Sequence, residues 1–222
     1  MRKFSTQTPD VCRETVCGLI SEIRELPSMD FSELVPEKTA LIVVDVINGF
    51  IREGAMSSPI IEGIIPHTVR LTEKCKDAGI PIAAFADCHS ENCAEFASFP
   101  PHCIDGTSES ELVDELKAVG GYFLIKKNST NGFHEKDFMH ELVRKPKVNT
   151  FIVAGDCTDI CVMQFCLTLK TWFTAQNRTS EIIVPLNCVE TYDSPGHNAD
   201  FMNIAAYKIM KDSGIKFVSE IK

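Results

Sequence analysis

The stretch Ala40-Leu41-Ile42-Val43-Val44, followed at once by Asp45, decides the fold class of this chain. Five successive apolar residues, rich in β-branched side chains, make a run that is too short for a helix of average length. An uninterrupted run of this kind is typical of a strand whose two faces are both covered, as in a parallel sheet between layers of helices. The sequence therefore predicts a buried strand with a carboxylate at its C-terminal end.

Along the rest of the chain, apolar strand-like segments alternate with segments of helical periodicity. Further strands are expected at residues 81–86, 122–125, 150–154, 181–185 and 215–218. Helices are expected at residues 9–26, 61–78, 109–118, 134–144, 158–175 and 198–212. This alternation predicts an α/β fold of three layers, Rossmann-like, with a mostly parallel central sheet of about six strands and helices on both faces.

Length and composition favour one main domain that folds on its own. The chain has 222 residues, of which 44% are hydrophobic and 24% charged, close to the average of soluble globular proteins. We expect an N-terminal helical extension at residues 1–38 and one α/β domain at residues 39–222.

The charge balance and the absence of long apolar runs limit the kinds of partner and the cellular location that we expect. Asp and Glu number 31 and Lys and Arg 22, which gives a net charge of −9. This charge repels phosphate backbones and anionic lipid, so we expect no nucleic-acid or membrane partner. No apolar run reaches the roughly 18 residues of a spanning helix, and residues 1–10 lack the apolar segment of a signal peptide. We therefore expect a cytoplasmic protein whose ten cysteines are mostly reduced.

Chemically reactive side chains follow four of the expected strands. In open parallel sheets, ligands bind beyond the carboxyl ends of the strands, where loops can present polar groups. The side chains at these ends are Asp45 after the first core strand, Asp87 and His89 after the second, Lys126 and Lys127 after the third, and residues 155–161 after the fourth.

Cys161 lies in the expected first turn of a helix that follows the fourth strand. Free backbone amides and the helix dipole at that end favour an anion, so the thiol there can have a lowered pKa and act as a nucleophile. The same amides can stabilise a tetrahedral oxyanion. The alternative is that Cys161 is only a small buried residue of an apolar helix, and that Thr158 and Asp159 are only helix caps.

A cysteine nucleophile needs a base, and no histidine follows a strand beside Cys161. Asp45 can fill this role, because burial at the end of an apolar strand raises the pKa of a carboxylate towards the range useful for proton transfer. Lys127 at a neighbouring strand end would oppose that rise. The alternative is a turn-capping Asp45 and a solvated Lys127.

The loop after the second expected strand carries a candidate set of metal ligands. Two imidazoles and one or two carboxylates are mixed ligands that suit zinc, iron or manganese. These residues are Asp87, His89, Glu95 and His102. A solvated acidic loop is the alternative, and a thiolate site using Cys88, Cys93 and Cys103 is another, although their spacing is not a paired C-x-x-C.

Taken together, these segments resemble the nicotinamidase and isochorismatase-like cysteine hydrolases. VVDVINGF at 43–50 resembles the catalytic Asp segment of the family, and KNSTNGF at 127–133 is similar to its lysine motif, whose Lys-to-Phe spacing selects Lys127 over Lys126. GDCTDICV at 155–162 resembles the nucleophile motif. Asp87-x-His89 with FPPHCIDGT at 99–107 is similar to the metal-binding segment of nicotinamidases. The resemblance runs from about residue 39 to the C-terminus.

The resemblance implies catalytic roles for three residues. Asp45 would take the proton of Cys161 and pass it to departing ammonia, while Lys127 would position both and offset charge. Backbone amides of Thr158 and Cys161 would form the oxyanion hole, with a cis peptide bond between Cys157 and Thr158.

The resemblance also implies a ligand set for one divalent metal ion, zinc, iron or manganese. Asp87, His89, His102 and Glu95 would hold it, the position of Glu95 varying between His and Glu in the family, and the ion would bind the pyridine nitrogen of the substrate. For the pocket, the resemblance implies Phe50, Phe99 and Cys157, where the two phenylalanines can otherwise be ordinary core residues. The sequence departs from the family at Asn131-Gly132-Phe133, where many members have Ser-Ala-Phe, and at Cys157, where members have another small or apolar residue.

The function implied is hydrolysis of nicotinamide to nicotinate and ammonia through a cysteine thioester, in NAD salvage. The substrate would be the small-molecule partner, and the family implies a homo-oligomer. One alternative is a related cysteine amidase or carbamoyl hydrolase that acts on a non-pyridine amide. Another is a non-catalytic metal- or redox-binding protein that uses the thiols and the histidine loop.

Overall fold

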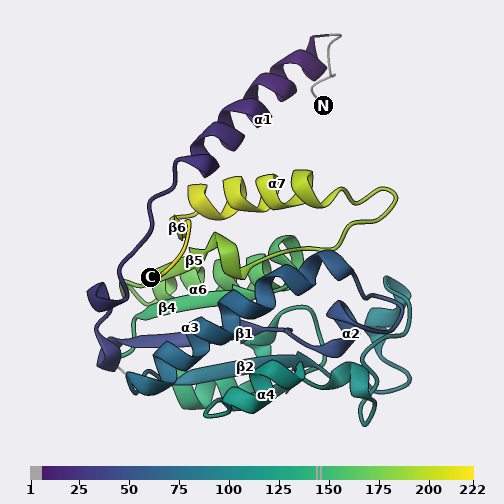
Figure 1. Ribbon diagram of the computed structural model, residues 1–222, viewed down its shortest axis with the longest axis vertical. Coiled ribbons are helices and arrows are strands. Elements are labelled where there is room, and N and C mark those ends of the chain that lie inside the picture. Colours follow the sequence, from purple (N-terminus) through teal and green to yellow (C-terminus); the bar gives the residue numbers. More distant parts are fainter. Residues whose placement is uncertain (1–6, 144, 146) are drawn as a thin grey trace.

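Six parallel strands form one central sheet in the computed structural model, which describes residues 7–143, 145 and 147–222 (Figure 1). The strand order is β3-β2-β1-β4-β5-β6, so β1 and β4 lie at the centre. The strands are β1 (Thr39–Val44), β2 (Ile82–Asp87), β3 (Phe123–Lys127), β4 (Thr150–Gly155), β5 (Glu181–Pro185) and β6 (Lys216–Val218). The predicted α/β class and the parallel sheet of about six strands are confirmed.

Helices cover both faces of this sheet. The α-helices of the described residues are α1 (Thr8–Arg24), which lies outside these two layers, and α2 (Asn48–Ile51), α3 (Ile65–Asp77), α4 (Asp114–Val119), α5 (Lys136–Phe138), α6 (Met163–Ala175) and α7 (Ala199–Asp212). Side chains of α5, α6 and α7 belong to the hydrophobic cluster on one face. Side chains of α2, α3 and α4 belong to the cluster on the other face.

Strand β1 shows why the apolar run forms the centre of the fold. All six of its residues are buried. Ala40, Ile42 and Val44 pack in one hydrophobic cluster, whereas Leu41 and Val43 pack in the other. Because successive side chains of a strand point to opposite faces, an uninterrupted apolar run can fill both clusters at once.

The expected strands lie within two residues of the observed ones, but four helices differ. The helix expected at 61–78 begins as a 3-10 helix, Pro59–Ile64, and is α-helical only from Ile65. The segment expected as a helix at 109–118 starts within a 3-10 helix, Ser108–Ser110, and is α-helical only from Asp114, because Leu112 forms an isolated bridge with Ile47. The helix expected at 134–144 is reduced to α5 and a π-helical turn, Met139–Val143; residue 144 lies outside the described part of the chain. The helix expected at 158–175 begins as a π-helical turn, Thr158–Val162, and continues as α6.

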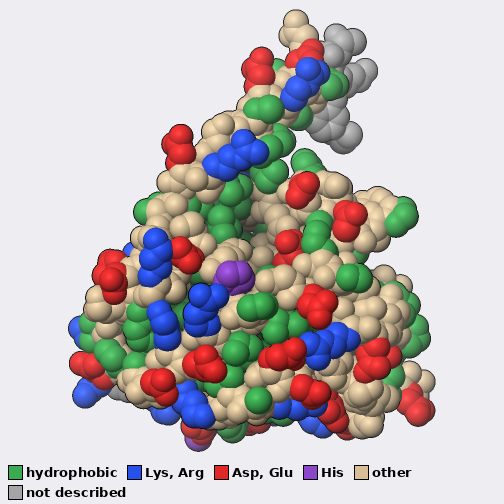
Figure 2. Space-filling view, viewed as in Figure 1, with side chains coloured by type: hydrophobic (Ala, Val, Ile, Leu, Met, Phe, Trp, Pro, Cys, Tyr) green, Lys and Arg blue, Asp and Glu red, His purple; other side chains and the backbone are tan. Residues whose placement is uncertain are grey.

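Helix α1 extends away from the body of the molecule (Figure 1) and has no buried residue. Hydrophobic side chains gather where α1 meets the body (Figure 2), among them Leu19 and Ile23, which pack partly buried against the core. After α1 the chain turns back and pairs with the C-terminal segment, where the Met29 amide donates to the Glu220 carbonyl at 2.9 Å. Within the described residues, no helix is both long and apolar enough to cross a membrane.

Candidate active site

The carboxyl ends of neighbouring strands bring the predicted reactive residues together. Asp45 follows β1 directly, while Asp87 and Lys127 end β2 and β3 and are partners in the sheet register. Cys161 lies in the π-helical turn after β4. Oxygen atoms of Asp45 and Asp87 and the sulfur of Cys161 all lie within 4.8 Å of one another.

Gly155, the last residue of β4, lies in close contact with the end of β1. A Cβ built on Gly155 would lie 1.9 Å from the carbonyl oxygen of Val44, and the φ angle of Gly155 is +122°. Only glycine meets both requirements without strain. The nucleophile turn therefore starts beside the strand that carries Asp45.

Lys127 is the charge at the centre of this cluster. Its ammonium Nζ lies 2.8 Å from Asp45 Oδ2 and 2.5 Å from Asp87 Oδ1. Its Nζ also lies 3.8 Å from Cys161 Sγ. The side chains of Lys127 and both carboxylates are at most 1% exposed. By contrast, Lys126 pairs with Asp105 on the surface, in agreement with the choice of Lys127 made from the motif spacing.

Burial and the ammonium of Lys127 have opposite effects on the pKa values of Asp45 and Cys161. Burial raises the pKa of Asp45 to about 7, although the ammonium of Lys127 opposes the rise. Burial also raises the pKa of the Cys161 thiol well above its ordinary value, again against the effect of Lys127. The lowered thiol pKa expected from the start of a helix is therefore wrong for this state, because desolvation is the larger effect. The thiol needs a proton acceptor, and Asp45 is within reach.

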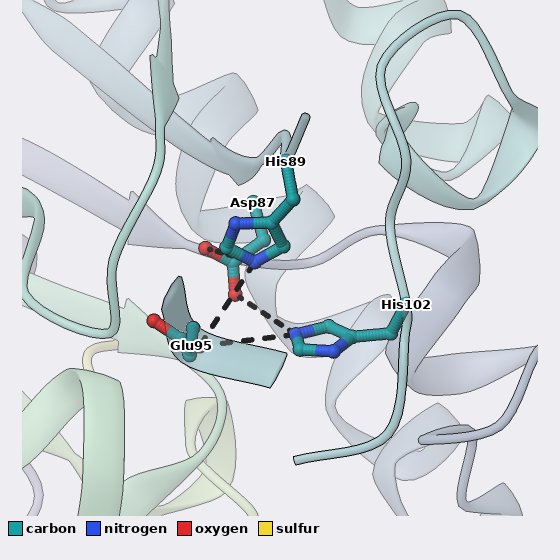
Figure 3. Close-up of side chains that lie close together, drawn as sticks. All are labelled: Asp87, His89, Glu95 and His102. Atoms are coloured by element: carbon teal, nitrogen blue, oxygen red, sulfur yellow. Dashed lines mark ion pairs between the residues drawn. The ribbon is translucent and has the colours of Figure 1, made fainter. Parts of the chain in front are cut away.

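Asp87, His89, Glu95 and His102 point towards one another from β2 and the loop that follows it (Figure 3). One ligand atom from each lies within 4.8 Å of the other three. The Nε2 of His89 lies 3.6 Å from Asp87 Oδ1, and the Nε2 of His102 lies 3.9 Å from Glu95 Oε1. These distances leave room for a cation between the atoms, so the four residues form a candidate metal-binding site.

The contacts around these four side chains fit a bound cation. His102 Nδ1 donates to the Pro100 carbonyl at 2.8 Å, which leaves its Nε2 lone pair facing the cluster. His89 Nδ1 lies 3.1 Å from Asn128 Oδ1, and its buried Nε2 has no hydrogen-bond partner. Two imidazole nitrogens and two carboxylates suit zinc, iron or manganese.

The cysteines of the same loop do not join this ligand set. The sulfur of Cys93 lies 3.3 Å from His89 Nδ1, on the far side of the ring from the cluster. Cys88 donates to Asp105 at 3.0 Å. Among the described residues, the candidate ligand groups contain neither of these cysteines nor Cys103, so the thiolate alternative is not supported.

A small cavity opens in front of the cluster. The predicted residues that line it are Phe50, Asp87, Glu95, Phe99, His102, Cys157 and Cys161. Met56, Thr130, Ile160 and Tyr192 also line it, and the sequence reasoning missed them. Thr130 lies inside the lysine motif and Ile160 inside the nucleophile motif, so their place in these motifs could have marked them as residues that line the cavity.

Two expectations about the nucleophile turn are corrected. The cis peptide bond joins Asp156 and Cys157, one residue earlier than expected. The backbone amide of Thr158 donates to the Glu190 carbonyl at 3.0 Å, so this amide is engaged in holding the turn. The predicted role of Thr158 in the oxyanion hole therefore does not fit the structure.

Close packing explains why glycine stands at position 132, where the expected pattern Ser-Ala-Phe has alanine. A Cβ on this residue would lie 2.8 Å from ring atoms of Phe85, a fully buried residue of β2. Asn131 accepts from the Phe133 amide at 3.1 Å and donates to Thr168 Oγ1 at 2.9 Å. The Asn131-Gly132 pair thus packs the lysine motif closely against β2 and α6.

The fold and the site together define an α/β enzyme of the hydrolase class. The sequence profile of the isochorismatase domain matches residues 39–211. Nicotinamidase 1 of Arabidopsis thaliana is 31% identical over 212 residues, which cover 82% of this chain and 85% of that protein. The chain therefore belongs to the isochorismatase family.

Solved structures show the same fold. The pyrazinamidase of Pyrococcus horikoshii, in complex with zinc, matches with a TM-score of 0.67 and 28% identity, covering 82% of this chain and 98% of that one. The N-carbamoylsarcosine amidase of Thermoplasma acidophilum matches with a TM-score of 0.66 and 24% identity, covering 83% and 99%. At that identity the second likeness concerns the fold alone.

Proposed function

We propose that this chain is a nicotinamidase that hydrolyses nicotinamide to nicotinate and ammonia and thereby serves NAD salvage. The observation that carries the proposal is the buried cluster of Asp45, Lys127 and Cys161 beside the ligand set of Asp87 and its neighbours, at the mouth of a small cavity. The similarity to Nicotinamidase 1 of Arabidopsis thaliana supports the choice of amide.

The reaction begins with a proton transfer. Asp45 takes the thiol proton of Cys161, and the sulfur attacks the carbonyl carbon of the amide. Asp45 then gives this proton to the amide nitrogen, the carbon–nitrogen bond breaks, and ammonia leaves a thioester on Cys161. A water molecule attacks the thioester while Asp45 takes one of its protons. The carbon–sulfur bond then breaks, Asp45 returns that proton to the Cys161 sulfur, and the acid product leaves as a carboxylate after giving its proton to solvent.

Lys127 supports both proton transfers without changing its own charge. Its ammonium lies against Asp45 and within 3.8 Å of the Cys161 sulfur, so it stabilises whichever of the two is negative. Asp87 also contacts Lys127 and balances the charge of the buried cluster.

The oxyanion of the tetrahedral intermediate needs donors near Cys161. Because the Thr158 amide is engaged by Glu190, we assign the donors to the backbone amides of Cys157 and Cys161. Both residues line the cavity. Backbone amides fixed in this way stabilise negative charge at no cost in reorganisation.

Three of the four ligand residues, Asp87, Glu95 and His102, line the cavity. A divalent cation held by Asp87, His89, Glu95 and His102 would supply a Lewis-acid anchor for the pyridine nitrogen. Phe50 and Phe99, which line the same cavity, give flat apolar walls for the ring. The amide group is then placed towards Cys161.

The test is ammonia release from nicotinamide by the metal-loaded protein. We expect release by the wild type, none above background by Cys161→Ala, and loss on metal stripping that returns when the metal is restored. The matched control is Cys166→Ala, which removes a buried thiol of α6 that does not line the cavity and should keep its activity.

Two outcomes would overturn the proposal. Wild-type turnover in Cys161→Ala would exclude the thioester route. Release of ammonia from a non-pyridine or carbamoyl amide, with none from nicotinamide, would keep the cysteine hydrolase chemistry and replace the substrate.

A further inference from the structure

Tyr192, in the loop between β5 and α7, is held at the cavity by contacts that the proposed chemical steps do not use. It lines the cavity together with Cys157 and Cys161. Its ring stacks on the imidazole of His197, with ring centroids 3.8 Å apart and planes inclined by 8°. We propose that Tyr192 determines which amide-bearing ring the cavity accepts, and that His197 is the positioning residue that holds it in place. This inference rests on the proposed amide hydrolysis.

A tight turn brings the ring of His197 onto Tyr192. The amides of Ser194 and His197 each donate to the carbonyl of the other, at 3.0 and 2.9 Å. Pro195 and Gly196 occupy the two central positions, and Gly196 has a φ of +91°. Proline followed by glycine is a pair that a type II turn favours, because the second central residue needs a positive φ. The chain therefore folds back within four residues.

His197 contacts the backbone of Tyr192 as well as its ring. His197 Nδ1 lies 2.9 Å from the carbonyl oxygen of Tyr192. His197 Nε2 lies 2.9 Å from Asp159 Oδ2. A polar contact at each ring nitrogen holds the imidazole in one orientation against the Tyr192 ring.

Asp159 connects this arrangement to the nucleophile. It lies two residues before Cys161 in the same turn and is only 7% exposed. Its Oδ1 accepts from Thr191 Oγ1 at 2.6 Å, while Oδ2 binds His197. Two bonds to one carboxylate tie the loop of Tyr192 to the turn of Cys161, so the Tyr192 ring keeps a fixed place relative to the attacking sulfur.

This placement gives Tyr192 a role in selection. With Phe50 and Phe99 it contributes the aromatic part of this small cavity. A rigid wall beside a small cavity excludes added ring substituents, because neither Tyr192 nor the loop can yield without breaking the contacts to His197. The substrate class that fits is an unsubstituted planar six-membered ring that bears a carboxamide.

The experiment compares kcat and KM for nicotinamide and for its ring-methylated analogues, in the metal-loaded protein. For Tyr192→Ala we expect the KM for nicotinamide to rise about tenfold, with a smaller change in kcat. We also expect kcat/KM for at least one methylated analogue, relative to nicotinamide, to rise by about tenfold or more. Tyr192→Phe keeps the ring and should stay close to the wild type.

His197→Ala should shift KM and selectivity in the same direction as Tyr192→Ala. If His197 acts through Tyr192, the double variant should be no worse than Tyr192→Ala alone. The matched control is His140→Ala, whose side chain is 73% exposed, and which should change neither quantity. Unchanged selectivity in Tyr192→Ala, or additive effects of the two substitutions, would overturn the inference.

A failure of the proposed function can be told from a failure of this inference. If the wild type hydrolyses a different amide, the same variants are compared on that amide and its methylated analogues. If it hydrolyses none, nuclear magnetic resonance tests the stacking directly. The ring current of Tyr192 should move the imidazole proton resonances of His197 upfield, and Tyr192→Ala should abolish this shift while Tyr192→Phe retains it. Absence of the shift in the wild type would overturn the positioning role.

Discussion

Lys127 is the residue on which the buried charges of the site depend. Two carboxylates, Asp45 and Asp87, share its ammonium group, and all three side chains are withdrawn from water. Charges buried in this way remain stable only while they are paired. Removing Lys127 therefore affects folding as well as catalysis.

We expect Lys127→Met to lower the free energy of unfolding by ~3–5 kcal/mol, because it leaves two buried carboxylates without a countercharge. Urea unfolding measures this, and hydrolysis should fall to background. Lys126→Met is the matched control. That lysine is 60% exposed and pairs with Asp105 on the surface, so its removal should cost at most ~1 kcal/mol. Equal losses in the two variants would contradict the central role of Lys127.

Asp45 should determine the acid side of the pH profile. Burial raises its pKa to about 7, and only its ionised form can take the thiol proton. As the pH falls below about 7, the ionised fraction falls, so kcat/KM should drop by roughly tenfold per pH unit. A profile that stays flat down to pH 5 would rule out Asp45 as the base. Asp45→Asn should have no hydrolytic activity at any pH.

At the scale of elements, the junction of β1 and β4 places the nucleophile beside its base. The two strands pair from Thr39 with Thr150 to Val44 with Gly155. The Asp156 amide also donates to the Val44 carbonyl at 2.9 Å, beyond the end of β4. The contact between these strand ends therefore sets the position of the turn that carries Cys161.

Gly155→Ala tests this junction. The added methyl group would collide with the Val44 carbonyl, and the positive φ would be strained. We expect a loss of about 2–5 kcal/mol in the free energy of unfolding. Any protein that folds should also lose activity, because β4 must move away from β1.

Gly18→Ala is the control for this substitution. Gly18 lies inside α1 with no atom within 4 Å of an added Cβ. Because alanine favours a helix more than glycine does, this change should be neutral or stabilising by at most ~1 kcal/mol. A Gly155→Ala protein as stable and active as Gly18→Ala would contradict the role of the junction.

At the scale of the whole molecule, α1 lies outside the compact α/β body. It contacts the body through Leu19 and Ile23, and Glu22 binds Tyr207 and Lys211 of α7. Leu26, just after the helix, packs against the same core. The following residues belong to the body, since Met29 and Leu34 are buried. The domain boundary expected at residue 38 stays a prediction. The burial of Met29 and Leu34 favours a boundary after Leu26.

We expect deletion of residues 1–26 to leave a folded protein with kcat/KM within about twofold of the full chain. The reason is that α1 has no buried residue and no part in the cavity. Activity assays and thermal unfolding measure this, and sedimentation of both proteins shows whether the expected homo-oligomer needs α1. Loss of activity in a folded, shortened chain would show that α1 supports the site.

Much of this arrangement could be predicted from local sequence. The strand at Ala40–Val44 is visible because its apolar run has no break, and residues 181–185 match β5 fully. The motif spacing selected Lys127 over Lys126. In the structure Lys127 is buried against Asp45, whereas Lys126 lies on the surface. The helix at 109–118 was placed too early because the bridge between Leu112 and Ile47 joins residues 65 positions apart, which no local pattern reveals.

The sequence by itself determined the order of the elements and the residue types at the strand ends, because hydrophobic periodicity and motif spacing are properties of neighbouring residues. Only the tertiary structure decided how those residues behave. The raised pKa of Cys161 comes from burial by distant segments, and the engagement of the Thr158 amide by Glu190 comes from a loop more than 30 residues away. The stacking of Tyr192 on His197, and its tie to Asp159, likewise depend on the packing of that loop against the nucleophile turn.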